Sequence, residues 1–230
     1  MDTTDNQLSI VYIDHFGDDR SPLRAARVST LTDQETYSQE RDLKLSRYLL
    51  SHGHTSPYEH CGATFLIKCP IYCARQIMRH RTFSYNEVSR RYTDENISFY
   101  LPKTLNRQHK RRLQCSTDQE LERSQDLLDQ MRDHQEAASQ LYYALIDQGV
   151  SREQARAVLP QSLMTRFYMS GNLLNWLKFI KIRTDHHTQH EARMIATGAK
   201  MHLTELFPLT MMIAEEVMLQ TQETQENEKG

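Results

Sequence analysis

A cluster of arginines interleaved with polar side chains is the part of this sequence best suited to chemistry. Residues 79–92 read RHRTFSYNEVSRRY. The planar guanidinium of arginine grips phosphate and carboxylate groups through paired hydrogen bonds, which the point charge of lysine cannot do. The serines, the asparagine and the glutamate of the same stretch add donors and acceptors suited to a polar heterocycle. The segment therefore predicts a nucleotide site.

Glycine-rich phosphate loops are missing from the sequence. The chain has seven glycines, and they form neither GxGxxG nor GxxxxGK[ST]. Those loops hold phosphate with backbone amides at a helix N-terminus. Side chains must therefore do much of the work of holding any phosphate.

The overall charge argues against a protein that coats nucleic acid. The formal net charge is -2, so a polyanionic partner must be met by a local basic patch. Such a patch, formed by residues 75–91 and the basic stretch 107–112, keeps an RNA-binding module open as an alternative. It lacks the aromatic stacking platform that single-strand binders use.

Two histidine-rich clusters raise the question of a metal. One lies at residues 52–60. In the other, His186 and His190, like His187 and Glu191, are four residues apart, which is metal-ligand spacing on a helix. The order fits no HExxH pattern. The favoured interpretation is the polar lining of a cofactor site with no metal, and a metal-dependent nucleotide phosphohydrolase stays as the alternative function.

The arginine segment needs elements that position it. Alternating residues predict a strand at 61–69, and Pro70 suits the first turn of a following helix over 71–81. On that helix Gln76, Arg79 and His80 share one face. The arginine cluster would thus begin where this helix ends.

Hydrophobic periodicity and capping residues predict the remaining elements and a chain that is mostly helix with a few strands. In the first half of the chain, the remaining predicted elements are a short buried strand at 8–13 and a loop at 102–115. In the second half, they are a long helix capped by Ser116 or Thr117 and ending near Gln148, and a short helix between Ser151 and Pro160. An amphipathic helix at 172–183 and a helix at 186–206 that Pro208 ends complete the prediction. No repeat or linker divides residues 1–220, which we expect to form one domain. Residues 221–230 are almost wholly polar and are predicted to be disordered.

The sequence also predicts a cytoplasmic protein. The N-terminus has neither the basic nor the apolar region of a signal peptide, and no apolar run approaches the roughly 20 residues of a membrane span. The four cysteines form no CxxC pair, so reduced thiols are expected.

The arginine segment resembles the signature of the flavin-dependent thymidylate synthases, RHRxxxxxxxS. Here Arg79, His80 and Arg81 are followed, seven residues later, by Ser89. The wider pattern RHRxxSxNExSxRY is also met, by Ser84, Asn86, Glu87, Arg91 and Tyr92. Further stretches look like family segments in family order: RAARVS at 24–29, HGHTSPYEH at 52–60, ARQ at 74–76, EQARAVLP at 153–160, TRF at 165–167 and FIKIRTDHHTQHE at 179–191. The resemblance covers roughly residues 8–207.

This resemblance implies a fold and a reaction. Members of the family methylate dUMP to dTMP, with methylenetetrahydrofolate as the carbon donor and FAD, reduced by NADPH, as the source of hydride. They are homotetramers whose active sites are built from several subunits. The implied fold is a single α+β domain, mostly helical, with a small mixed or antiparallel sheet. The implied partners are small molecules, and neither nucleic acid nor a membrane.

The resemblance also assigns residues. Arg183 matches the position that ionises or polarises the pyrimidine, a task that suits a fixed cation; read alone, it is an arginine complementing a helix dipole. The implied dUMP contacts are Gln76, Arg79, Glu87, Val88, Ser89, Arg90, Arg91 and Arg156. The implied FAD contacts are Ser56, Arg79, His80, Arg81, Glu87, Asn172, Lys178, His54 and His187.

Three positions qualify this assignment. Many members have an arginine where this chain has Leu174, and an asparagine or histidine where it has Lys178. Lysine can hold a flavin phosphate as a point charge, and leucine cannot. Ser89 has no base clearly placed to activate it, so we interpret it as a substrate-binding residue, in a mechanism without a covalent bond to the enzyme.

Overall fold

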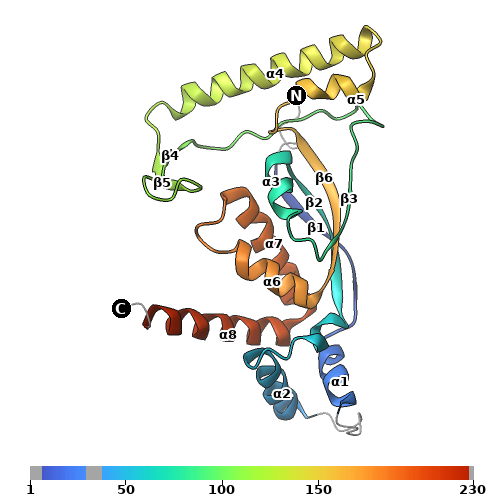
Figure 1. The fold of residues 1–230 in the computed structure, drawn as a ribbon, viewed down its shortest axis with the longest axis vertical. Coiled ribbons are helices and arrows are strands. Elements are labelled where there is room, and N and C mark those ends of the chain that lie inside the picture. The colour runs from blue at the N-terminus through green and yellow to red at the C-terminus, as the bar shows by residue number, and fades with distance from the viewer. Residues whose placement is uncertain (1–6, 30–37, 228–230) are drawn as a thin grey trace.

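A four-stranded antiparallel sheet forms the centre of the computed structural model, which describes residues 7–29 and 38–227. The strand order is β1-β2-β6-β3 (Figure 1). The strands are β1 (Ser9–Phe16), β2 (Gly62–Pro70), β3 (Ser84–Glu87) and β6 (Met164–Asn172). β2 and β6 pair along their whole length and make the rigid middle of the sheet.

Helices lie on one face of this sheet and beyond its ends, and α6 and α7 pack against that face (Figure 1). The helices are α1 (Arg20–Val28), α2 (Gln39–Ser51), α3 (Ile71–Ile77), α4 (Ser124–Asp147), α5 (Arg152–Ala155), α6 (Leu173–Arg183), α7 (His190–Leu206) and α8 (Pro208–Asn227), with two short 3-10 helices, η2 (Ser56–Glu59) and η3 (Arg156–Val158). The α+β class, largely helical with a small antiparallel sheet, is confirmed. Along the described residues, no helix is both long and apolar enough to cross a membrane.

The main core lies between the sheet and α6. Trp176 is fully buried, and its ring packs edge-on against Phe65 of β2 and against Phe83 and Phe179. Its indole Nε1 donates to the carbonyl oxygen of Ala63 over 3.0 Å. Large aromatic rings in edge-to-face contact stabilise a core beyond their buried area. This contact fixes α6 on the sheet.

The predicted strand at 61–69 is confirmed. Along β2 the side chains of Ala63, Phe65 and Ile67 are buried toward the helices, and the intervening residues are half-buried. The helix predicted at 172–183 is also confirmed, as α6. The side chain of Asn172 accepts a hydrogen bond from the amide of Asn175 over 3.0 Å and so caps this helix.

The strand predicted at 8–13 exists, but its predicted burial is wrong. Among the described strands, β1 lies at the edge of the sheet and pairs with β2 alone. Ile10 lies against Gly198 of α7, whereas Val11 is 49% exposed and Phe16 54% exposed. The apolar run predicted a strand correctly but not its burial, because only part of the run packs on α7.

The loop predicted at 102–115 is partly wrong. β4 (Asn106–Gln108) pairs with β5 (Ser116–Glu120) in a second, two-stranded sheet. Its strands are polar and exposed, so no alternation of apolar residues marked them. The long helix consequently begins at Ser124 and not at Ser116 or Thr117, and it ends at Asp147, close to the predicted end.

The helix predicted at 71–81 is shorter, since α3 ends at Ile77. The hydroxyl of Tyr85 donates to the carbonyls of Ile77 and His80, at 3.1 and 2.9 Å. These bonds satisfy carbonyls that a helix end leaves free. They hold the turn that leads the arginine segment into β3.

The helix predicted at 186–206 begins later, at His190. His186 and His187 therefore lie before α7, and the helical spacing expected for His186 with His190, and for His187 with Glu191, does not occur. At the other end of the chain, α8 continues to Asn227, into the segment 221–230 predicted to be disordered. Glutamine and glutamate are good helix formers, so the polar run extends the preceding apolar turns. Residues 228–230 lie outside the described part.

Candidate functional site

The arginine segment is attached to α6 and to the sheet at several points. The side-chain amide of Asn175 donates to the carbonyl of Thr82 over 3.0 Å. Phe83 packs so closely on Gly171 that a Cβ there would lie 2.5 Å from the ring. Residues 84–87 then pair with β6 as β3. The segment is thus held against the sheet from the turn after α3 onward.

Arg183 and His80 meet at the centre of the candidate site. Arg183 is the last residue of α6, and its Nε donates to Nε2 of His80 over 2.9 Å. Its Nη2 donates to the carbonyl of Gln76 over 3.1 Å. Residues from α3 and α6 that are distant in the sequence are thereby joined around one guanidinium.

This contact fixes the protonation state of His80. A guanidinium nitrogen only donates, so Nε2 of His80 accepts and the ring is neutral with its proton on Nδ1. Burial lowers the pKa of His80, and the neighbouring Arg183 lowers it further. Burial also lowers the pKa of Arg183. Both groups are half-buried, where a fixed charge acts more strongly than in water.

Gln76 is held from its other side by Gln189. The side-chain Nε2 of Gln76 donates to Oε1 of Gln189 over 2.5 Å. Gln189 immediately precedes α7, so this bond ties α7 to the α3 end of the site. The chain of contacts runs from Gln189 through Gln76 and Arg183 to His80.

Glu87 and Val88 lie at the edge of the sheet. Oγ1 of the buried Thr165 donates to Oε1 of Glu87 over 2.6 Å. The amide of Val88 donates to the carbonyl of Arg166 over 3.0 Å. β6 therefore fixes the direction in which the carboxylate of Glu87 leaves β3.

Arg91 and Arg156, far apart in the sequence, converge on Glu153. Nη2 of Arg91 lies 3.7 Å from the Glu153 carboxylate, and Nε of Arg156 donates to the Glu153 carbonyl over 3.3 Å. Both guanidinium groups are exposed. These two side chains form a second group of cations among the predicted dUMP contacts.

The side chain of Ser89 forms a hydrogen bond with the nearby backbone. Its hydroxyl accepts from the amide of Arg91 over 3.3 Å, and among the described residues no histidine or carboxylate bonds to it. No base that could activate a serine nucleophile is in place. This agrees with a binding role for Ser89.

Arg79 and Arg81 leave their guanidinium groups exposed to solvent. Within the described ranges their side chains make no hydrogen bond or ion pair. Two neighbouring arginines that pair with no acidic side chain add little to the stability of the fold. They are suited to binding a ligand that carries phosphates. This is the feature of the structure that best suits FAD.

The remaining positions assigned to FAD are dispersed. Lys178 is exposed on α6, while Leu174 is buried in the core and cannot replace the arginine of other members. The ring of His54 stacks on Tyr48. Ser56 lies in η2, and among the described residues no bond joins either His54 or Ser56 to the arginine segment.

His187 lies in the loop before α7, where Arg112 of the β4–β5 hairpin contacts its ring. It forms an exposed group with Asp185 and His186, whose possible ligand atoms lie within 4.8 Å of one another. The positive charge of Arg112 beside His187 would repel a metal cation bound to this group. The structure does not bring His187 into contact with the other residues assigned to FAD.

Sequence reasoning missed three supporting residues. Gln189, Thr165 and Tyr85 hold Gln76, Glu87 and the turn at His80 respectively. Gln189 and Thr165 lie in stretches that carry the resemblance, but their roles depend on which side chains the fold places opposite them. Only the folded structure shows these partners.

Comparison with known proteins places these residues in a family context. The chain matches the Thy1 family model, described as thymidylate synthase complementing protein, over residues 12–209. It is 39% identical over 198 residues to a flavin-dependent thymidylate synthase of Pseudothermotoga lettingae, covering 86% of each chain. It is also 39% identical over 208 residues to the enzyme of that name from Thermus thermophilus, covering 90% of this chain and 76% of the relative.

Solved structures show the same fold. The chain resembles the UMP/dUMP methylase PolB of Streptomyces cacaoi bound with 5-Br dUMP, with a TM-score of 0.84 and 31% identity. The match covers 90% of this chain and 94% of that one. These comparisons give no support to the phosphohydrolase alternative.

Proposed function

The chain belongs to the family of thymidylate synthase complementing proteins, and we propose that it is a flavin-dependent thymidylate synthase. In this reaction dUMP gains a methyl group at C5 and becomes dTMP. Methylenetetrahydrofolate supplies the carbon, NADPH supplies the reducing electrons, and the proton at C5 is lost. The observation that carries the proposal is the half-buried Arg183, fixed by His80 and Gln76 at the end of the arginine segment.

Arg183 is proposed to activate the pyrimidine. C5 of uracil becomes nucleophilic when negative charge gathers on N3 and O4, and a preorganised cation stabilises that charge. Nε and Nη2 of Arg183 are occupied by His80 and Gln76, and among the described residues Nη1 has no acceptor. The neutral His80 holds the guanidinium without neutralising it, so its full charge remains available.

The dUMP phosphate and sugar are proposed to be held by the other assigned residues. Arg91 and Arg156 together offer forked donors suited to a phosphate. Glu87, oriented by Thr165, offers an acceptor for a hydroxyl or a ring N–H. Ser89 lies between these groups in the sequence.

FAD is proposed to be held chiefly by Arg79 and Arg81, with His80, Glu87 and Asn172 beside them. Bound FAD would supply the hydride that converts the transferred carbon into a methyl group. The side-chain oxygen of Asn172 already caps α6, which leaves its amide nitrogen for a ligand. Lys178 offers a point charge where many members have an asparagine or histidine, and Leu174, at the position of an arginine in many members, offers no polar contact.

A homotetramer is part of the proposal. His54, Ser56 and His187 are assigned to FAD, but among the described residues no hydrogen bond joins them to Arg79 or Arg81 within one chain, as expected if other subunits complete the site. Exposed apolar side chains also cross the sheet. Val11 pairs with Leu66, which pairs with Tyr168, and Val11 and Tyr168 are 49% and 44% exposed.

A cytoplasmic location is also proposed. Its support is the state of the cysteines: Cys61, Cys69, Cys73 and Cys115 are all free thiols. Free thiols persist in reducing compartments.

The cofactor assignment is tested by the absorbance spectrum of the purified protein. Flavin bands retained through gel filtration, or acquired on adding FAD, are expected. The double variant Arg79→Gln/Arg81→Gln should bind FAD more weakly. Arg75→Gln, which removes an exposed arginine of α3, is the control for the loss of a single charge nearby. A protein that binds no flavin under any of these conditions contradicts the proposal.

A further inference from the structure

Two hydrogen bonds between side chains join α3 to the start of α7. One is the bond from Gln76 to Gln189. In the other, the hydroxyl of Tyr72 donates to Oε1 of Glu191 over 3.0 Å. Tyr72 and Gln76 are four residues apart and share a face of α3. The two helices, which are in contact (Figure 1), are therefore linked at two points one turn apart.

Glu191 is a buried carboxylate outside the set of residues assigned to dUMP or FAD. It lies in the first turn of α7 and is only 7% exposed. An acidic side chain in a first turn complements the helix dipole, but this effect does not require burial. Burying a carboxylate costs free energy unless hydrogen bonds compensate for the lost water. The burial of Glu191 therefore points to a role for the group that surrounds it.

Tyr100 completes this group. Its ring lies edge-on to that of Tyr72, with 6.4 Å between the centroids. Burial raises the pKa of Tyr72, and the neighbouring Glu191 raises it further. Burial also raises the pKa of Tyr100 to about 12, and Glu191 adds to this effect. Both phenols therefore keep their protons beside the carboxylate.

The position of α3 matters to Arg183. Nη2 of Arg183 donates to the carbonyl of Gln76, the residue that Gln189 holds from the other side. A shift of α3 relative to α7 would move this carbonyl and, with it, the guanidinium. Misplacing a catalytic group by about 1 Å can slow a reaction about a hundredfold.

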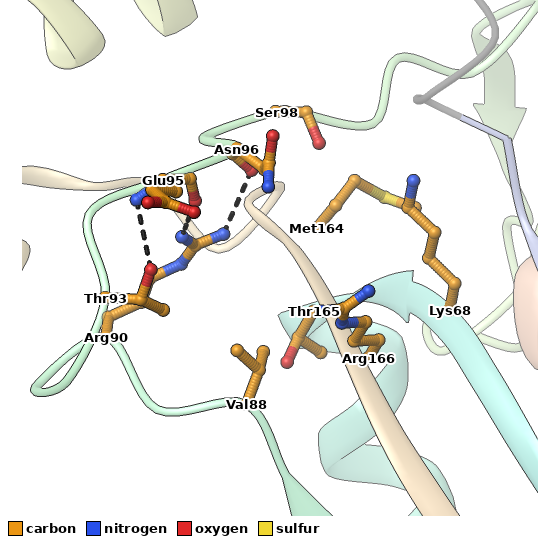
Figure 2. A pocket seen from close by; sticks show the side chains of 10 residues that line it. All are labelled: Lys68, Val88, Arg90, Thr93, Glu95, Asn96, Ser98, Met164, Thr165 and Arg166. Atoms are coloured by element: carbon orange, nitrogen blue, oxygen red, sulfur yellow. Dashed lines mark hydrogen bonds between the residues drawn. The ribbon is translucent and has the colours of Figure 1, made fainter.

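Arg90 belongs to a separate set of contacts, as Figure 2 shows. Its Nη1 and Nη2 donate to the carbonyls of Glu95 and Asn96, at 2.5 and 3.1 Å. Its guanidinium thus stabilises the stretch that follows β3, and no described bond joins it to α3 or α7. The polar contacts that align these two helices are those around Gln189 and Glu191.

We propose that Glu191, held by Tyr72 and Tyr100, is a positioning residue for the activation of dUMP. It aligns α7 with α3, so that the neighbouring bond between Gln189 and Gln76 forms. This role rests on the proposed function and adds three residues to the support of its site.

Variants of the group separate a hydrogen bond from the bulk of a side chain. Tyr72→Phe removes one donor to Glu191 and keeps the ring. Glu191→Leu removes the acceptor, whereas Glu191→Gln keeps an acceptor oxygen. Ser46→Ala is the matched control, because it removes another buried hydroxyl, which bonds to Tyr58 over 3.1 Å and lies in α2.

The readout compares two steps in the purified, FAD-loaded protein. Reduction of the flavin by NADPH without dUMP, followed by absorbance, does not involve the pyrimidine and is the reference for each variant. Formation of dTMP by the reduced protein, relative to this reference, should be about tenfold slower in Tyr72→Phe. The loss should be larger in Glu191→Leu and smaller in Glu191→Gln. Ser46→Ala should keep the wild-type ratio of the two rates.

The positioning role is overturned if Tyr72→Phe forms dTMP at the wild-type rate, and this variant decides alone should Glu191→Leu fail to fold. It is also overturned if both steps slow equally, or if Ser46→Ala matches the loss in Tyr72→Phe, since either result indicates a general loss of stability. In each case the wild type still forms dTMP and the proposed function stands. A wild type that forms no dTMP would instead reject the proposed function.

Discussion

Nε of Arg183 donates a hydrogen bond to Nε2 of His80 across 2.9 Å, joining the last turn of α6 to the turn that follows α3. The bond holds a cation in place with a neutral partner. Pairing with a carboxylate would have fixed the same side chain but cancelled its field. The site therefore keeps a positioned positive charge ready for a substrate that develops negative charge.

Replacing Arg183 by alanine should abolish most dTMP formation. Removing one preorganised donor to a developing anion costs roughly a hundredfold to a thousandfold in kcat. The protein should still bind FAD, because Arg79 and Arg81, the chief proposed FAD contacts, are not bonded to Arg183 among the described residues, although His80 loses its partner. Lys181→Ala, in the same helical turn and exposed, is the control. Near-normal turnover by Arg183→Ala would remove Arg183 from the proposed role.

The pKa of His80 predicts how stability depends on pH. It is lowered below the ordinary value of 6.5, chiefly by burial and also by Arg183. The unfolded chain therefore binds a proton at this residue more readily than the folded chain. The stabilising contribution is fully present above about pH 6.5 and is lost as the pH falls through the folded pKa.

The measurement for His80 is the free energy of unfolding in urea between pH 7.5 and 5.0. His80→Gln keeps an acceptor for Arg183 but cannot titrate, so the decline toward low pH should be shallower in this variant. The comparison with the wild type cancels the titration of the other histidines. Identical slopes for both proteins would mean that His80 does not carry the effect.

Gln189 should act through Gln76 and not on the substrate itself. Gln189→Leu removes the acceptor for Nε2 of Gln76, and a lost hydrogen bond of about 1–1.5 kcal/mol corresponds to about a tenfold fall in kcat/KM for dUMP. Gln189→Glu retains an acceptor oxygen and should recover most of that activity. If both variants lost activity equally, the hydrogen bond to Gln76 would not be the reason.

Trp176 should be essential to the fold that positions the site. Trp176→Ala removes a fully buried ring and the donor to Ala63, and such a change costs about 3–5 kcal/mol of stability. Trp176→Phe keeps most of the ring contacts and should cost clearly less. Urea midpoints of both variants give the comparison, and equal losses would show that ring packing is not what matters.

The sequence predicted the elements whose patterns are local. The alternation of 61–69 and the amphipathic run at 172–183 correspond to β2 and α6. β3 was missed because four largely exposed residues carry no pattern. β6 was missed although Thr165, Phe167 and Met169 alternate as buried residues, which is a strand signal.

The arginine segment by itself predicted a nucleotide site, but the roles of the individual site residues could be assigned only through the resemblance. Arg156 alone resembles any surface arginine, and its convergence with Arg91 on Glu153 depends on how the chain folds. The supporting roles of Gln189 and Thr165 could not be predicted for the same reason, because their hydrogen-bond partners are distant in the sequence. The predicted spacing of His186 and His190 failed because α7 begins four residues later than expected.

The most direct measurement is dTMP formation by the purified protein from dUMP, NADPH and methylenetetrahydrofolate labelled in its methylene carbon, with and without added FAD. The account predicts that mass spectrometry will find the label in the methyl group of dTMP, in an amount that depends on FAD and NADPH. A flavin-loaded protein that forms no labelled dTMP under these conditions would contradict it.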